Sequence, residues 1–247
     1  MLEYTQKRRN EMQTTLMGPV KGFHTILMAI SITSQNRFPT FLIPSEAELW
    51  TLAQELVDMH EPDKRTYHAP AHPCNMFDVF VDHKAVIDLS NDSVDIIAIY
   101  WMFILHDVII KVGTAHGWSE RESAEFAYVL LIKLGYPQSF ALFVKRGILA
   151  TAKHSLDGIP EEEKPTVALL LDLDLMGLGQ DAEGFAADTE SIYLEYKHHY
   201  TREEYDEGRK KWAQSFRKPQ RASVYHTQYF AHLEQQAQKN LTALAER

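Results

Sequence analysis

The 247-residue sequence predicts an all-α fold. Apolar residues recur at helical spacing in most segments, and no stretch alternates apolar and polar residues as a β-strand would. Capping boxes, in which glutamate follows serine or threonine after three residues, occur at Ser45, Ser119 and Thr201. The sequence contains no internal repeat, low-complexity tract or heptad pattern that would favour a repeat or coiled-coil architecture.

The composition is that of an ordinary soluble globular protein, with 45% apolar and 24% charged residues. The formal net charge of −9 argues against nucleic-acid binding, although a local basic cluster could still hold a small phosphorylated substrate. Cys74 is the single cysteine, which excludes an intrachain disulfide and fits a reducing, cytoplasmic location. The apolar runs are too short to span a bilayer, so no membrane partner is expected.

Residues 1–44 are expected to form an N-terminal extension to a domain of residues 45–247. The apolar run 22–32 lies too far from the basic residues near the start for a signal peptide, and it predicts a packing helix. After a proline-containing connector, Ser45 is expected to start an amphipathic helix.

Two histidines follow in a loop that leads into the next helix. Prolines make residues 68–73 a helix entrance, since proline is favoured in the first helical turn. His68 and His72 are four residues apart, so His68 would lie at the helix mouth and His72 one turn inside. Arg65 adds a cation nearby; the alternative is that both histidines simply face solvent.

The longest apolar segment, residues 94–110, predicts a buried helix that starts near Asn91 or Asp92. His106 and Asp107 occur together towards its end, where an unpaired buried charge would be costly. A bound metal ion would satisfy both side chains. The alternative is a histidine bonded to a backbone carbonyl beside an aspartate that faces water.

Another helix is expected after Ser119, with Glu122 completing its capping box, and Gly135 should end it. Glu122 is thus explained either by capping or by a role in a site. The helix that follows, residues 140–152, leads directly into Lys153.

Two carboxylates, Asp172 and Asp174, interrupt the apolar run 167–178. Buried carboxylates need partners. Positions two apart on a helix point about 200° apart around its axis. One aspartate is therefore expected to face a metal ion and the other to bond to protein groups.

The last third of the chain is predicted to be helical as well. Residues 185–196 have an amphipathic face, and Thr201 starts a helix that contains Arg209. A final helix is expected over residues 225–245.

Side chains from three predicted helices could converge on one ion: His72, His106, Asp107, and either Asp172 or Asp174. Nitrogen and carboxylate ligands suit a divalent transition metal or magnesium. Such a set leaves coordination positions open for water, as catalytic sites require. The single cysteine excludes a cysteine-rich structural zinc site.

Several short motifs occur in order between residues 45 and 245: Arg65-Thr-Tyr-His-Ala-Pro-Ala-His72, His106-Asp107, Glu122-Ser-Ala124, Thr151-Ala-Lys-His154, Asp172-Leu-Asp-Leu-Met-Gly-Leu-Gly179, Glu195-Tyr196, Gly208-Arg209 and Ala237-Gln-Lys-Asn-Leu241. This order resembles the HD-domain superfamily, specifically its branch of small metal-dependent phosphohydrolases. The resemblance implies an all-α HD-domain bundle with extra N- and C-terminal helices. It also implies a divalent ion (Mn, Fe, Zn, Ni, Co or Mg) held by His72, His106, Asp107 and Asp174.

The activity that the resemblance implies is hydrolysis of a phosphate ester, of a nucleotide or another small phosphorylated metabolite. The ion would activate water, Asp107 would orient that water, and His68 would protonate the leaving oxygen. The candidates to hold phosphate or to complete the site are Arg65, Glu122, Lys153 and Arg209. His154 could serve a second ion, although one ion is expected.

The alternative function is a metal- or nucleotide-binding HD module without turnover. Departures from the family pattern, among them Ala69 and Arg121, would then mark a lost activity.

Overall fold

The computed structural model describes residues 18–60, 64–83, 94–216 and 221–246. These ranges contain helices and no strand, so the predicted all-α class is confirmed. The helices, in chain order, are α2 (Gly18–Arg37), α3 (Glu46–Met59), α4 (Ala71–His83), α5 (Ile96–Leu105), α6 (Trp118–Lys133), α7 (Gln138–Thr151), α8 (Lys164–Asp174), the 3₁₀ helix η2 (Leu175–Gly179), α9 (Ala182–Tyr196), α10 (Arg202–Ser215), the 3₁₀ helix η3 (Gln228–Leu233) and α11 (Glu234–Ala245).

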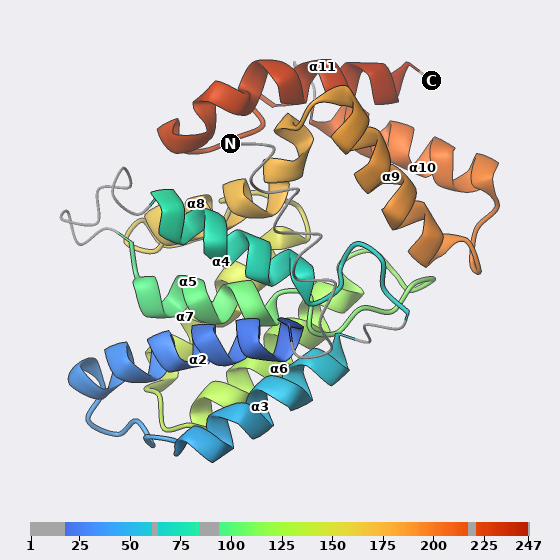
Figure 1. The fold of residues 1–247 in the computed structure, drawn as a ribbon. Helices are drawn as coiled ribbons and strands as arrows, with labels where there is room; N and C mark the ends of the chain where they lie inside the picture. Colours follow the sequence, from blue (N-terminus) through green and yellow to red (C-terminus); the bar gives the residue numbers. More distant parts are fainter. Residues whose placement is uncertain (1–17, 61–63, 84–93, 217–220, 247) are drawn as a thin grey trace.

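Helix α5 lies at the centre of the molecule, with α2, α4, α6, α7 and α8 packed around it (Figure 1). Its side chains from Ile97 to Leu105 are all buried, because they are large and apolar on every face. The helix starts later than predicted: Asp95 is its N-cap, and the Asp95 carboxylate accepts hydrogen bonds from the N–H groups of Ile97 and Ala98. The start expected at Asn91 or Asp92 falls outside the described residues.

The packing helix expected near the N-terminus is present as α2. Its side chains Phe23, Ile26 and Ile30 are almost fully buried and belong to the same apolar core as α5. Helix α2 packs on α3 and α5 (Figure 1). From Gly18 onwards, the segment expected to be an extension therefore covers one side of the central helix.

Two of the three predicted capping boxes are confirmed. The Ser45 and Thr201 side chains each accept a hydrogen bond from the third residue of the helix, and the glutamate there returns one. The box at Ser119 is wrong, because α6 begins one residue earlier, after Gly117 in a left-handed conformation (φ 74°). The Ser119 hydroxyl instead accepts a hydrogen bond from the Lys111 N–H.

The final predicted helix, residues 225–245, is divided into η3 and α11. The preceding backbone N–H groups are taken up by carboxylates: those of Val224 and Tyr225 donate to Glu234, and those of His226 and Thr227 donate to Asp172. Residues 224–227 are not helical, and the helical part of this segment begins at Gln228.

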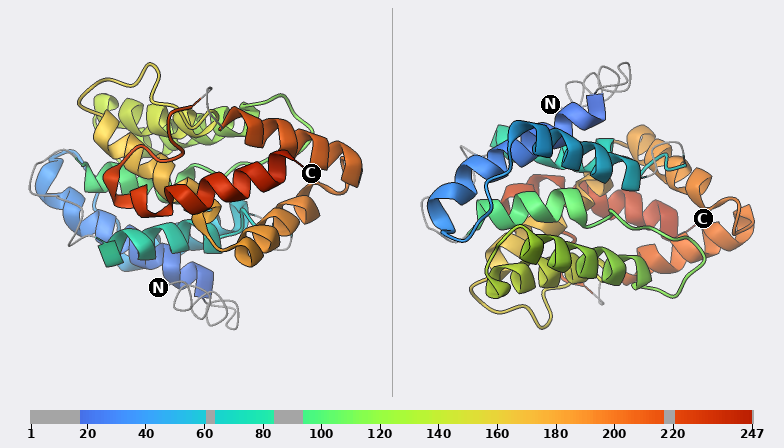
Figure 2. Two further views of the ribbon diagram at one scale, coloured as in Figure 1. Left: turned by 90° about the horizontal axis from the view of Figure 1, so that it is seen from above. Right: turned by 90° about the horizontal axis from the view of Figure 1, so that it is seen from below.

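Helices α9 and α10 lie at one end of the molecule, and α11 packs against α10 (Figure 2). None of the described helices combines the length and the hydropathy needed to cross a membrane.

Candidate metal and catalytic site

Helix α4 brings His72 into the interior. Pro70 directly precedes the first residue of α4, so His72 lies in the first turn and its side chain is buried. The His72 Nε2 atom lies 3.1 Å from Asp174 Oδ1. His68 precedes the helix, as the sequence predicted, and it lines the cavity described below.

The C-terminal end of α5 fixes both His106 and the aspartate after it. His106 is the C-cap of the helix, and its Nδ1 lies 3.2 and 3.0 Å from the carbonyl oxygens of Met102 and Phe103. Donation from Nδ1 to these carbonyls leaves Nε2 as the ring nitrogen that faces the carboxylates of Asp107 and Asp174. This Nε2 is buried and has no hydrogen-bond partner among the described residues. It lies 3.1 Å from Asp107 Oδ2 and 3.6 Å from Asp174 Oδ1.

Helix α8 turns its two aspartates in different directions, as the helical geometry predicted. Asp172 is fully buried and accepts hydrogen bonds from the N–H groups of His226 (2.6 Å) and Thr227 (2.7 Å). Asp174, the last residue of the helix, faces His72, His106 and His154 instead. The expectation that one aspartate bonds to protein groups is confirmed for Asp172.

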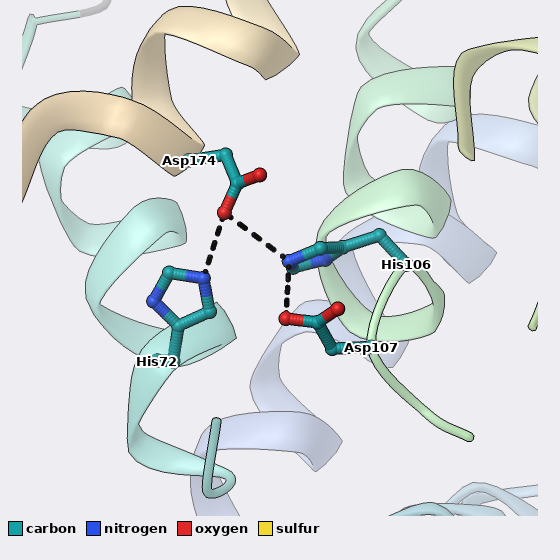
Figure 3. Close-up of side chains that lie close together, drawn as sticks. All are labelled: His72, His106, Asp107 and Asp174. Atoms are coloured by element: carbon teal, nitrogen blue, oxygen red, sulfur yellow. Dashed lines mark hydrogen bonds and ion pairs between the residues drawn. The ribbon is translucent and has the colours of Figure 1, made fainter. Parts of the chain in front are cut away.

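Four side chains thus meet at one point: His72, His106, Asp107 and Asp174 (Figure 3). One potential ligand atom from each lies within 4.8 Å of all the others. The buried Nε2 of His106 faces the carboxylates of Asp107 and Asp174 without forming a hydrogen bond, and a metal ion between them could be coordinated by all three groups. The donor set of imidazole and carboxylate groups fits a divalent ion.

The charges of the cluster stabilise one another. Burial opposes protonation of His106, but Asp107 and Asp174 outweigh it and hold the pKa of His106 well above its usual value. Burial likewise opposes ionisation of Asp174, but its bonds to His106, His154 and His72 hold the pKa of Asp174 well below its usual range. The cluster therefore carries negative charge on its aspartates at neutral pH, as a cation site requires.

Arg65 binds the backbone next to this cluster, on the side away from the cavity. It is buried, and its guanidinium donates to the backbone carbonyls of Asp107 (2.6 Å), Val108 (3.3 Å) and Met59 (3.2 Å). The guanidinium does not line the cavity. The predicted phosphate-binding role of Arg65 is therefore replaced by a positioning role: it holds the turn that presents Asp107.

His68 is oriented by a carboxylate from α9. Its Nδ1 lies 2.7 Å from Glu195 Oε2, and Glu195 Oε1 accepts hydrogen bonds from the N–H groups of Tyr67 and His68. Burial would lower the pKa of His68, but the bond to Glu195 and the charge of Asp107 raise it overall. The Nε2 of His68 has no partner among the described residues and belongs to a ring that lines the cavity.

A cavity of about 500 Å³ opens onto this cluster. It is lined by Tyr67, His68, Asp107, His116, Glu120, Thr151, Ala152, His154, Asp174, Leu175, Leu178, Phe185, Ile192, Tyr196, Tyr200, Glu204, Tyr205, Gly208, Arg209 and Trp212. The predicted acid, two of the predicted metal ligands and one predicted phosphate-binding cation therefore share one space.

Two other predicted site residues do not line this cavity. Lys153 is exposed, and Glu122 is half-buried on α6. The glutamate of α6 that lines the cavity is Glu120, two residues earlier. Cys74 is buried, and burial raises the pKa of its thiol to about 12, as expected for a packing residue.

Sequence reasoning gave no role to Glu195 and underrated His154. Glu195 lies 127 residues from His68 in the sequence, so no local pattern links the two residues. The one signal for a role of Glu195 is a carboxylate on the largely apolar face of α9. The His154 Nε2 lies 3.0 Å from Asp174 Oδ2, on a residue whose φ of 47° is left-handed. That backbone conformation carries no recognisable sequence signal for histidine.

No family model, curated protein or solved structure matches this chain. The assignment to the HD-domain superfamily therefore stays a prediction, and the site has to be judged by its own geometry.

Proposed function

We propose that the protein is a metal-dependent hydrolase of a small phosphate ester. The observation that carries this proposal is the shared cavity: a histidine with a carboxylate partner, His68, lines the same space as Asp107 and Asp174 of the candidate metal cluster. An acid beside a cation site is the pairing that phosphate-ester hydrolysis needs, because a negative oxygen must be neutralised and a leaving oxygen must be protonated.

The ion would be held by His72, His106, Asp107 and Asp174. When bound, a divalent ion supplies Lewis acidity, which polarises a phosphoryl oxygen and makes water a stronger nucleophile at neutral pH. The backbone of α5 contributes by fixing the tautomer of His106, since its carbonyls accept from Nδ1 and direct Nε2 towards the cluster.

His68 acts on the leaving group in this proposal. Its raised pKa keeps a larger share of the ring protonated at pH 7 than for a free histidine. Glu195 holds Nδ1, so the proton transferred to the leaving oxygen is the one on Nε2. As the bond from phosphorus to that oxygen breaks, the oxygen takes this proton, and Glu195 stabilises the ring throughout. Asp107 would accept a hydrogen bond from the attacking water, whose oxygen forms the new bond to phosphorus and whose proton is released to solvent.

The test measures metal content and phosphate release for the parent, His68→Ala and a control, His198→Ala, whose histidine is exposed and outside the cavity. His68→Ala should keep its metal and its fold but lose about 10²–10⁴-fold in turnover of an alkyl phosphate. The loss should be smaller on nitrophenyl phosphate, because that leaving group needs less protonation. His198→Ala should match the parent on both substrates.

Two outcomes would contradict the proposal. If His68→Ala turns over both esters like the parent, His68 is not the acid. If the parent releases no phosphate from any ester with any divalent ion, the metal- or nucleotide-binding module without turnover becomes the better explanation.

A further inference from the structure

Helices α9 and α10 build an aromatic wall of the cavity. Six aromatic side chains line the cavity, and five of them belong to this wall or to the link between its helices: Phe185, Tyr196, Tyr200, Tyr205 and Trp212, with Tyr67 as the sixth. Flat rings of this kind bind another flat ring by stacking or edge contacts. The wall is more apolar than hydrolysis of a phosphate group by itself requires.

Among the described residues that line the cavity, Arg209 is the one arginine or lysine. Its Nε is buried and has no hydrogen-bond partner among the described residues, and its guanidinium carbon lies 4.1 Å from the Trp212 ring centroid. Burial lowers the pKa of Arg209. A partly buried guanidinium whose Nε is buried without an acceptor is a natural place for a ligand to supply an anion.

The other partly buried arginines of the described ranges have oxygen acceptors. Arg146 binds Glu163, Arg202 binds Glu190 and Asp206, and Arg221 binds the carbonyl of His154. Arg209 therefore differs from them in having no oxygen acceptor among the described residues, while it lines the cavity.

Gly208, the neighbour of Arg209, supplies an independent observation. It lies inside α10, where glycine is less favourable than alanine, and a Cβ built on it would meet no atom within 4 Å. Gly147 of α7 shows the contrast, because a Cβ there would overlap with the Met102 side chain. Packing within the described chain explains Gly147 but not Gly208. Since Gly208 lines the cavity, its missing side chain leaves room for a ligand.

The charges on the lining limit the negative charge that a bound ligand can carry. Arg209 is balanced there by Glu120 and Glu204, in addition to Asp107 and Asp174 of the metal cluster. Each further phosphate of a di- or triphosphate would add negative charge without a further arginine or lysine to meet it. A volume of about 500 Å³ suits a small molecule with one ring system.

We propose that the substrate is a phosphomonoester with a single phosphate and a flat aromatic ring, whose phosphate is bound by Arg209 and whose path to it is kept open by Gly208. This inference rests on the proposed function. It selects adenosine monophosphate as a test compound over adenosine diphosphate, which has more charge, and over glycerol phosphate, which has no ring.

The first test is the order of kcat/KM for phosphate release. Adenosine monophosphate should exceed both adenosine diphosphate and glycerol phosphate by about tenfold or more, in line with stacking on the aromatic wall. A preference for the diphosphate, or equal rates with glycerol phosphate, would overturn the inference and leave the proposed function intact.

The second test uses two variants of α10 with neighbouring controls. Arg209→Gln should raise KM for the monophosphate about tenfold or more, and Lys210→Gln, which removes the same charge outside the cavity, should not. Gly208→Ala should raise Tm by about 2–4 °C through helix propensity and still raise KM. Glu207→Ala, on an exposed position, should leave KM unchanged.

If no ester is hydrolysed, calorimetric measurement of adenosine monophosphate binding tests whether Arg209 binds the phosphate. Binding that is at least about tenfold weaker in Arg209→Gln than in Lys210→Gln supports the assignment, although the proposed hydrolysis has then failed. No binding to the parent, or equal binding by both variants, overturns it.

Discussion

The ends of α3 and α5 place two buried histidines in nearly the same local setting. His60 is the C-cap of α3 and His106 the C-cap of α5, and in each the ring Nδ1 lies within hydrogen-bond distance of a carbonyl four residues back. In each, Nε2 is buried without a hydrogen-bond partner among the described residues. The two histidines differ in their neighbours. The Nε2 of His106 faces two aspartates, whereas the ring of His60 packs edge-on against Phe23.

This one difference reverses the chemistry of the two side chains. Burial lowers the pKa of His60 to about 3, whereas Asp107 and Asp174 raise that of His106 well above its usual value. A buried histidine held by a carbonyl is therefore not a metal site in itself. The carboxylates make the end of α5 a candidate cation site, whereas the His60 ring at the end of α3 packs in the core.

Removing the shared carboxylate should give the largest effect. Asp174→Ala should lose metal retention and activity together, because Asp174 faces three histidines of the site. Elemental analysis after dialysis measures this directly. Asp172→Ala is the matched control: it should keep the metal and lose about 1–3 kcal/mol of stability, since it removes a buried carboxylate and leaves two partly buried N–H groups without acceptors. The reverse result would place the metal on the other face of α8.

Arg65 links the two helix ends, so its removal tests whether the end of α5 needs that link. Arg65→Gln should weaken metal binding by about 10–100-fold, the usual effect of losing a group that orients a ligand. A competition titration with a metal-sensitive dye measures the affinity. Arg146→Gln, which removes a partly buried arginine paired with Glu163, should leave the affinity unchanged. Equal affinities in all three proteins would show that Asp107 is positioned without Arg65.

The smallest effect should come from His60, through pH alone. Its pKa is lower in the folded than in the unfolded chain, so below pH 6.5 the unfolded state takes up a proton that the native state does not. Stability is then lost as the pH falls from about 6.5 towards 3, by about 2 kcal/mol at pH 5. Urea unfolding of the parent and of His60→Leu at pH 7 and pH 5 should show a smaller loss in the variant. His198→Leu is the control, and identical pH dependence in all three would refute a neutral native His60.

Local signals in the sequence were sufficient for much of the fold. The boxes at Ser45 and Thr201 involve residues three apart, so they could be recognised directly. The box at Ser119 failed because α6 already begins at Trp118, which places Ser119 inside the helix. The divergence of Asp172 and Asp174 followed from helical geometry alone.

The candidate site was predictable only where the side chain itself carries the information. His106, Asp107 and the pair Asp172 and Asp174 stood out because ionisable groups within apolar runs need partners. His72 stood out through its spacing from His68 in the loop, and the choice of Asp174 over Asp172 came from the family resemblance. The role of Arg65 was not, because its acceptors are carbonyls, which every residue has. Glu195 was assigned no role because its partner lies far away in the chain, and only the packing of α9 beside the start of α4 brings the two together.

The left-handed backbone of His154 is unfavourable for stability, while its side chain contacts the candidate site. A histidine there costs about 1–2 kcal/mol relative to a residue that adopts this conformation freely. Directed evolution for heat resistance alone would therefore favour glycine or asparagine at position 154. The variants selected in that way would have a higher Tm and would lack the imidazole that contacts Oδ2 of Asp174.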